Sequence, residues 1–282
     1  MTILFDGIAY GMVLFVLSCG LSITLGLMNF VNLAHGAFAM AGGYATVILT
    51  QRLGVPFLAA LVLAFLVTAA LGVLLERTLY RRFYDRPHLD QVLFTIGLVF
   101  MATAGVDYLM GSGQQFIRLP DALKGRMEIA GVGISRYRLF IIALCGLLAL
   151  MLQAVLTRTR FGSQLRAAVD DARVARGLGI SVDRVFALTF AVGSGLAGLG
   201  GALGAEILGL DPTFPLKFLI YFLVVVTVGG TSSITGPFLA ALLLGIADVA
   251  GKYYVPSVGA FIIYTLMIVV LVVRPQGLFA RG

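Results

Sequence analysis

The chain has 282 residues, of which 60% are hydrophobic and only 12% are charged, and its formal net charge is +7. Soluble domains have about 45–50% apolar and about 25% charged residues, so the composition excludes a soluble globular protein and predicts a polytopic membrane protein. The positive charge does not indicate a nucleic-acid partner, because the arginines cluster between apolar runs, as in the cytoplasmic loops of membrane proteins.

Nine apolar segments follow one another along the chain and predict membrane helices. They cover residues 4–27, 34–50, 56–76, 92–110, 139–157, 185–209, 216–230, 238–254 and 257–273. The predicted fold class is an all-α, polytopic membrane bundle of eight or nine transmembrane segments, with residues 1–282 forming a single domain. The N-terminus lies outside if all nine segments span, and inside if one of them is re-entrant. The sequence leaves both arrangements open.

Glycine-rich stretches interrupt two of these segments. The first is MNFVNLAHGAFAMAGG at residues 28–43. The second is the last part of LKFLIYFLVVVTVGGTSSITG, which covers residues 216–236. Backbone leaves helical geometry at membrane depth only where it is buried in protein or lines a wet cavity. One broken segment in each half is typical of a transport pathway. The candidate pathway residues are Asn29, Asn32, His35, Gly36, Gly229, Gly230, Thr231, Ser232 and Ser233.

His35 in the first break has three interpretations. A buried hydrogen-bonding role that fixes the break is favoured at least as much as contact with a substrate, and a proton relay is the third. The other histidine, His88, lies in a loop, and the two cysteines, Cys19 and Cys145, lie in apolar runs. We therefore expect no metal site and no cofactor.

Basic loops predict the topology. Arg77–Gln91 carries four arginines and Arg158–Arg184 carries six, so both loops are expected in the cytoplasm. Two spans separate them, which places the intervening loop, residues 111–138, outside. Its glycines and Pro120 predict a folded or flexible cap rather than a helix. Counting onward places the C-terminal RPQGLFARG in the cytoplasm.

The cytoplasmic loop 158–184 predicts a short helix over residues 164–178. Leu165, Val169 and Ala172 recur on one helical face. Arg166–Asp170 and Asp170–Arg173 are spaced for ion pairs. A short helix joined rigidly to a span can carry a push from a cytosolic partner into the bilayer, whereas the plainer interpretation is a solvated charged loop. The candidate coupling residues are Arg166, Asp170, Asp171, Arg173, Gly177 and Gly179, and the two glycines are expected to end the helix.

Two further patterns predict packing rather than chemistry. Gly193, Ala197, Gly201, Ala205 and Gly209 form a ridge of small residues that favours close helix contact in lipid, either within the subunit, which is the favoured interpretation, or on a face that meets a second subunit. We expect structural pairing for the acidic residues in apolar stretches, Glu206 and Asp248, the latter with Lys252 four residues on.

Four stretches at compatible spacing resemble the permease subunits of branched-chain amino acid ABC transporters. They are residues 158–205, GLMNFVNLAHGAFAMAGGY at 26–44, TVGGTSSITGPFLAALLLGIAD at 227–248 and RPQGLF at 274–279. They cover nearly the whole chain in order, and the shorter of the two paired permeases is the most similar. The resemblance implies a multi-pass subunit of the bacterial inner membrane that moves a small solute, with branched-chain or other amino acids first. The partners that it implies are a second homologous permease, two cytosolic ATPases and a periplasmic binding protein.

A Walker A motif is absent from the sequence, which has only three lysines, so any ATP hydrolysis requires separate subunits. Catalytic constellations are absent too, and we expect a transport subunit rather than an enzyme. The main alternative is a secondary transporter driven by an ion gradient, because broken helices suit it equally well. A membrane scaffold without a pathway of its own is the other alternative.

Overall fold

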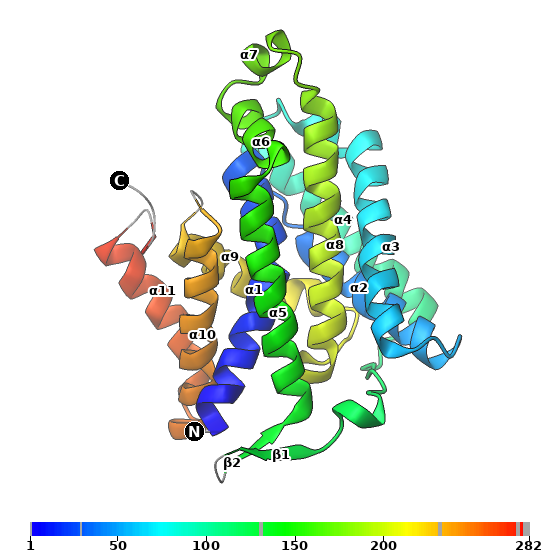
Figure 1. Ribbon diagram of the computed structural model, residues 1–282, viewed down its shortest axis with the longest axis vertical. Coiled ribbons are helices and arrows are strands. Elements are labelled where there is room, and N and C mark those ends of the chain that lie inside the picture. Colours follow the sequence, from blue (N-terminus) through cyan, green and yellow to red (C-terminus); the bar gives the residue numbers. More distant parts are fainter. Residues whose placement is uncertain (1, 29, 130–131, 231–232, 275–276, 279–282) are drawn as a thin grey trace.

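The computed structural model describes residues 2–28, 30–129, 132–230, 233–274 and 277–278, which are mostly helical (Figure 1). The first half contains α1 (Thr2–Met28), α2 (His35–Gln51), α3 (Phe57–Thr78), α4 (His88–Met110) and α5 (Arg136–Arg158). The second half contains α6 (Arg160–Asp170), α7 (Ala172–Gly177), α8 (Val182–Leu208), α9 (Phe214–Gly229), α10 (Thr235–Tyr254) and α11 (Ile262–Val273). Between them lie three short 3-10 helices, η1 (Tyr80–Phe83), η2 (Asp121–Leu123) and η3 (Gly259–Phe261), and two strands, β1 (Arg126–Ile129) and β2 (Val132–Ser135).

Six helices among the described residues are long and apolar enough to cross a membrane, namely α1, α3, α4, α5, α8 and α10. The apolar helices α9 and α11 are shorter, with 16 and 12 residues. At about 1.5 Å per residue, α9 rises about 24 Å against about 30 Å of hydrocarbon. The predicted helical membrane bundle is confirmed, and the count of eight or nine crossings stays a prediction.

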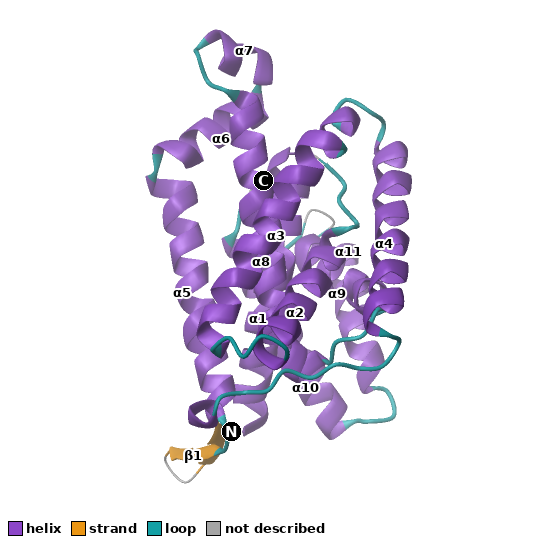
Figure 2. Cartoon of the chain, turned by 90° about the vertical axis from the view of Figure 1, so that its right-hand side faces the viewer, coloured by secondary structure: helices purple, strands orange, loops and turns teal. Residues whose placement is uncertain are grey.

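The centre of the bundle is formed by α1 and α8. In the most apolar 18-residue stretch of each helix, 89% of the residues are buried in α1 and 83% in α8, against 11% in α4. Figure 2 shows α5 and α4 on opposite sides of the molecule with α1 and α8 between them. Apolar side chains such as Phe100 and Leu109 on α4 are exposed. Lipid tails are as apolar as leucine, so this face of α4 needs no protein cover.

Glycines allow the central helices to touch through their backbones. A Cβ atom on Gly42 of α2 would overlap the backbone of Gly198 on α8, and one on Gly201 would overlap the Ala39 carbonyl. On α1, the backbone of Gly20 faces that of Gly193. Small residues permit such approach in lipid, so the small-residue ridge on α8 serves packing within the subunit at Gly193 and Gly201, as predicted.

The predicted cytoplasmic loop 158–184 and the predicted external loop 111–138 lie at opposite ends of the molecule. Helices α6 and α7 project at one end, and the antiparallel hairpin of β1 and β2 lies at the other end, near the N-terminus (Figure 1). Among residues 111–129 and 132–135, the regular elements are the short helix η2 and the strands β1 and β2. Helix α11 runs back toward the α7 end (Figure 1).

Candidate functional site

The first break separates α1 from α2 and covers residues 29–34. Side chains of α4 bind its backbone: the amide of Val31 donates to Gln91 Oε1 (3.0 Å), and that of Leu33 donates to Thr95 Oγ1 (3.3 Å). Non-helical backbone at membrane depth requires partners of this kind. Gln91 and Thr95 were not among the predicted site residues, although polar side chains beside an apolar run are a detectable signal.

Asn32, a predicted pathway residue, is enclosed by protein and only 1% exposed. Its Oδ1 accepts a hydrogen bond from the hydroxyl of Tyr80 on η1 (3.1 Å). The Tyr80 ring packs against Phe30, Phe94 and Phe190 at centroid distances of 5.5, 5.1 and 4.6 Å. This aromatic cluster keeps the break in one position relative to η1, α4 and α8.

His35 is the first residue of α2 and is also buried. Its Nε2 lies 2.7 Å from the Leu17 carbonyl of α1, and its ring stands edge-on to Phe222 of α9. Gly20 provides the space for the imidazole, because a Cβ there would overlap His35 Cε1. With a proton on Nε2 the ring donates to the carbonyl. This geometry supports the interpretation that His35 fixes the break.

The second break lies between the end of α9 at Gly229 and the start of α10 at Thr235, and the structure describes residues 230, 233 and 234 of it. Gly230 has φ +81°, and its amide donates to the Val226 carbonyl (2.8 Å) to end α9. At the far side Ser233 Oγ accepts from the amide of Gly236 (3.3 Å) in the first turn of α10. Both ends of the interruption are therefore terminated by defined local hydrogen bonds.

Gly277 and Leu278 of the C-terminal motif lie against the end of α9 beside the second break. The amide of Leu278 donates to the Val228 carbonyl near the end of α9 (2.8 Å). Gly277, at φ +92°, lies against Gly230, and a Cβ there would be 2.8 Å from the Gly230 nitrogen. The motif thus supplies a hydrogen-bond donor to the end of α9, where helices leave carbonyl groups without partners.

Of the other predicted pathway residues, Gly36 and Gly229 allow close contacts at the helix ends. A Cβ on Gly36 would lie 2.9 Å from Pro215 Cα, and one on Gly229 would overlap Pro237. Asn29, Thr231 and Ser232 lie outside the described residues. Each break is therefore held by residues of a neighbouring helix or of the C-terminal motif.

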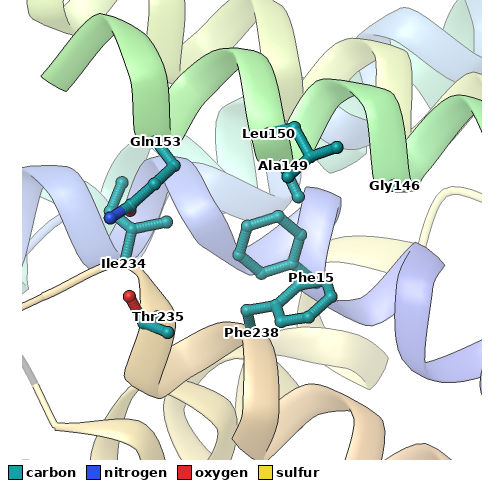
Figure 3. A pocket seen from close by; sticks show the side chains of 8 residues that line it. All are labelled: Phe15, Gly146, Ala149, Leu150, Gln153, Ile234, Thr235 and Phe238. Carbon is teal, nitrogen blue, oxygen red and sulfur yellow. The ribbon is translucent and has the colours of Figure 1, made fainter. Parts of the chain in front are cut away.

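An apolar cavity adjoins each break. The larger, of about 410 Å³, lies between α1, α5 and α10, and it is lined by Phe15, Gly146, Ala149, Leu150, Gln153, Ile234, Thr235 and Phe238 (Figure 3). The polar side chains of Gln153 and Thr235 lie toward one end, and the rings of Phe15 and Phe238 toward the other. The smaller, of about 350 Å³, lies between α2, α3 and α4 and touches Ala34 of the first break.

The coupling loop forms two helices, so the prediction of one helix over residues 164–178 was wrong. Helix α6 ends at Asp170 and α7 begins at Ala172. Asp171 between them is extended, and its Oδ1 accepts from the amides of Arg173 (2.8 Å) and Val174 (2.9 Å). Aspartate is unfavourable inside a helix and favourable at an N-cap, which explains the division.

The ion pairs predicted for Asp170 are not formed in the part of the chain that the structure describes. Arg166 instead donates to the Leu156 carbonyl in the last turn of α5. Asp170 and Arg173 belong to different helices, so their spacing of three residues no longer places them side by side. Gly162 permits the tight α5–α6 corner, because a Cβ there would overlap the Leu156 carbonyl.

The two cytoplasmic loops of the predicted topology meet at Asp183, in the first turn of α8. Its carboxylate pairs with Arg81 of η1 and lies 3.5 Å from Arg176 of α7. Ser181, the N-cap residue of α8, makes no side-chain hydrogen bond to the helix. Asp183 stands where a helix favours negative charge.

The free end of α7 carries exposed apolar residues beside exposed charges. Val174 is 58% exposed and Leu178 is 76% exposed. Arg173, Gly177 and Gly179 are exposed around them, and Gly179 has φ +83°, which turns the chain toward α8. This tip lies at the end of the molecule opposite the hairpin (Figure 1).

The buried carboxylate on α10 behaves as the sequence predicts. Lys252 Nζ lies 2.6 Å from Asp248 Oδ2. Glu206 on α8 does not form an ion pair within the described residues, contrary to expectation. It lines a polar cavity of about 650 Å³ at the hairpin end, together with the ion pair of Asp6 and Arg138.

Comparison with known proteins identifies the family. Residues 3–271 match the family model for the branched-chain amino acid transport system / permease component. The chain is 26% identical to the high-affinity branched-chain amino acid transport system permease protein LivH of Escherichia coli K12, over 99% of this chain and 94% of that protein. It is 29% identical to BraD of Pseudomonas aeruginosa, a permease protein of the same description, over 99% and 95%.

A second kind of permease is similar as well. The chain is 26% identical to LivM of Salmonella typhimurium, over 95% of this chain and 68% of LivM. No solved structure matches the chain significantly. The family match extends over almost the full length and includes both breaks and the loop that carries α6 and α7. The chain therefore belongs to the family of branched-chain amino acid transport system permease components.

Proposed function

We propose that this chain is the membrane-spanning permease subunit of an ABC importer whose cargo is a branched-chain or another small amino acid. A periplasmic binding protein delivers the cargo, and separate cytosolic ATPases drive its passage. LivH and BraD are named as branched-chain amino acid permeases, which supports this class of cargo. Salmonella typhimurium has relatives named both LivH and LivM, which supports a second, homologous permease as partner.

The α6–α7 projection is the observation that carries this proposal. It is joined directly to the spanning helices α5 and α8, and its tip exposes Val174 and Leu178 to water on the side that the basic loops place in the cytoplasm. Exposed apolar side chains rimmed by charges are typical of a protein-binding surface. We assign this tip to contact with an ATPase, and Arg173 to its rim.

The pathway follows the two breaks. We assign Ser233, with Asn29, Thr231 and Ser232, to its lining, and we assign Gly229 and Gly230, which pack against Pro237 and Gly277, to holding the second break. Asn32, His35 and Gly36 are buried or tightly packed, and we assign them to holding the first break. The apolar cavity beside the second break suits the side chain of leucine, isoleucine or valine.

The same topology gives the orientation in a bacterial inner membrane. The hairpin end faces the periplasm and the binding protein, and α7 and the C-terminal motif face the cytoplasm. The direction of α11 toward the α7 end supports this orientation (Figure 1).

Reconstitution distinguishes an ATP-driven permease from the secondary transporter that broken helices also suit. Proteoliposomes containing the complete complex are supplied with radiolabelled leucine, the binding protein and internal ATP. Uptake that requires ATP and survives an ionophore supports the proposal. Uptake that persists without ATP and collapses with the ionophore supports the secondary transporter.

A further inference from the structure

We propose that η1 is a positioning element that links the coupling loop to the first break, with Tyr80 and Arg81 as its two points of attachment. This inference rests on the proposed function, because it concerns how the ATP-driven movement reaches the pathway. It adds a second route beside the direct continuity of α6 and α7 with the spanning helices.

The inner end of the link is Tyr80, whose side chain is fully buried. Its hydroxyl donates to Asn32 Oδ1 within the break (3.1 Å). A buried polar atom that loses its partner is destabilised by its desolvation, so the break favours positions in which this bond persists. A displacement of Tyr80 therefore displaces Asn32 with it.

The outer end of the link is Arg81, the next residue. Its guanidinium pairs with Asp183 in the first turn of α8, and the same carboxylate lies 3.5 Å from Arg176 of α7. These three side chains come from two loops that are about 100 residues apart in sequence. Any change in the position of α7 or of the start of α8 alters the contact with η1.

The helix η1, which carries both Tyr80 and Arg81, is itself fixed to α4. The ring of Phe83 stacks on Phe94 with a centroid distance of 4.2 Å and an interplanar angle of 9°. Gln91 joins both sides, because its Nε2 donates to the Phe83 carbonyl (3.2 Å) and its Oε1 accepts from the Val31 amide (3.0 Å). The break and η1 therefore share a network with two separate connections.

The exposed ion pair at Arg81 suits a test, because exposed ion pairs contribute little to folding stability and their loss leaves the fold intact. Arg81→Gln breaks the outer contact, and Arg81→Lys retains the charge. Arg82→Gln is the matched control: Arg82 is the exposed neighbour, and it does not form an ion pair among the described residues.

The first measurement is hydrogen–deuterium exchange of the full chain in lipid nanodiscs. Arg81→Gln is expected to raise exchange of the amides at residues 30–34 about three- to tenfold, although Arg81 does not touch them. The amides at residues 30–34 are expected to exchange at the wild-type rate in Arg81→Lys and in the control Arg82→Gln. Unchanged exchange in Arg81→Gln overturns the proposal.

The second measurement is leucine transported per ATP hydrolysed, in proteoliposomes that contain the complete complex. Tyr80→Phe and Arg81→Gln each lower this ratio about two- to tenfold, and the double variant falls no further than the lower single variant, because both cuts interrupt one link. The control Tyr84→Phe removes a hydroxyl from a ring that also packs on Phe30 but whose partner is Glu76, and it leaves the ratio unchanged.

If the ratio of transported leucine to hydrolysed ATP falls in the double variant by the product of the two single-variant factors, the two residues act independently, which contradicts a shared link. If the wild-type complex shows no ATP-dependent uptake while Arg81→Gln still raises exchange at residues 30–34, the proposed function fails and the physical link stands. The two measurements therefore separate the two ideas.

Discussion

The amide of Val31, in the first break, donates to Gln91 Oε1 on α4, 60 residues further along the chain. The same glutamine donates through Nε2 to the Phe83 carbonyl (3.2 Å). Its Nε2 also donates to the Arg86 carbonyl (3.1 Å), so one buried side chain joins the first break to the turn that precedes α4. The first break is consequently a defined structure that α4 stabilises, and its stability depends on particular polar residues in an apolar helix.

Gln91→Leu leaves the Val31 amide without this partner, whereas the Phe83 carbonyl keeps the amide of Arg86 (3.1 Å). An unsatisfied buried group costs about 1–3 kcal/mol, so we expect a loss of about 1–3 kcal/mol in stability, measured by thermal unfolding in detergent. Gln153→Leu is the matched control, because Gln153 borders the apolar cavity and its amide does not bind backbone in the described residues. Equal losses in both variants would contradict the role of Gln91.

Gly42→Ala is expected to force α2 away from α8, because the new Cβ overlaps the Gly198 backbone. Overpacking of this kind costs about 1–3 kcal/mol, and size-exclusion chromatography of a fluorescent fusion should show a smaller monodisperse fraction. The control is Gly97→Ala on α4, where nothing lies within 4 Å of the added carbon. If Gly42→Ala behaves like Gly97→Ala, the packing of α2 on α8 is wrong.

Gly277→Ala is expected to impair transport by disturbing the second break. Both Gly277 (φ +92°) and Gly54 (φ +65°) have backbone conformations that cost a side chain about 1 kcal/mol. Only at Gly277 does the added carbon also meet Gly230 and the Thr227 carbonyl, both at 2.8–2.9 Å. Leucine uptake should therefore fall in Gly277→Ala and not in Gly54→Ala, at equal membrane levels. A similar effect of both changes would mean that strain alone, and not the contact with α9, matters.

Leu178→Asp is expected to weaken binding of the ATPases about 30-fold, which corresponds to an interface residue worth about 2 kcal/mol. Its side chain is 76% exposed, so the change should not affect folding. Gln164→Asp places the same charge on the exposed side of α6 and serves as the control. Co-purification of the complex measures both, and unchanged recovery with Leu178→Asp would exclude the tip of α7 from the contact.

Arg173→Glu and Arg166→Glu should differ, although both are arginines of the coupling loop. Arg173 is exposed on α7, so its reversal should reduce ATPase recovery alone. Arg166 donates to the Leu156 carbonyl of α5, so its reversal should also lower the melting temperature by removing a partner from a helix end. Identical melting temperatures for the two variants would contradict the assignment of Arg166 to the α5–α6 corner.

The sequence predicted the membrane bundle, both interruptions and the Asp248–Lys252 pair because these depend on local composition and spacing. Hydropathy identifies spans, and glycine-rich stretches identify breaks. The sequence could not predict which side chains bind the backbone of the breaks. Val31 and Gln91 are far apart in the chain, and the contact follows from how α4 packs on α2, which no local pattern encodes.

The coupling loop was predicted less well for a related reason. The periodicity of Leu165, Val169 and Ala172 suits one helix, but the capping bonds of Asp171 favour a division. The link from Arg176 through Asp183 to Arg81 joins two loops whose proximity depends on the packing of α3 against α8. The sequence predicted that His35 is a buried hydrogen-bonding residue. It did not predict which group His35 bonds, because the Leu17 carbonyl is brought to it only by the packing of α1 against α2.

The central claim is that the second break borders the route of the cargo, and thiol labelling at Ser233 tests it most directly. Ser233→Cys is introduced into the complete complex, with the buried Cys19 and Cys145 as an internal background. We predict that a water-soluble maleimide labels this cysteine in one nucleotide state and is excluded in the other, and that leucine slows the reaction. A cysteine at this position that stays as unreactive as Cys19 in every state would contradict the claim.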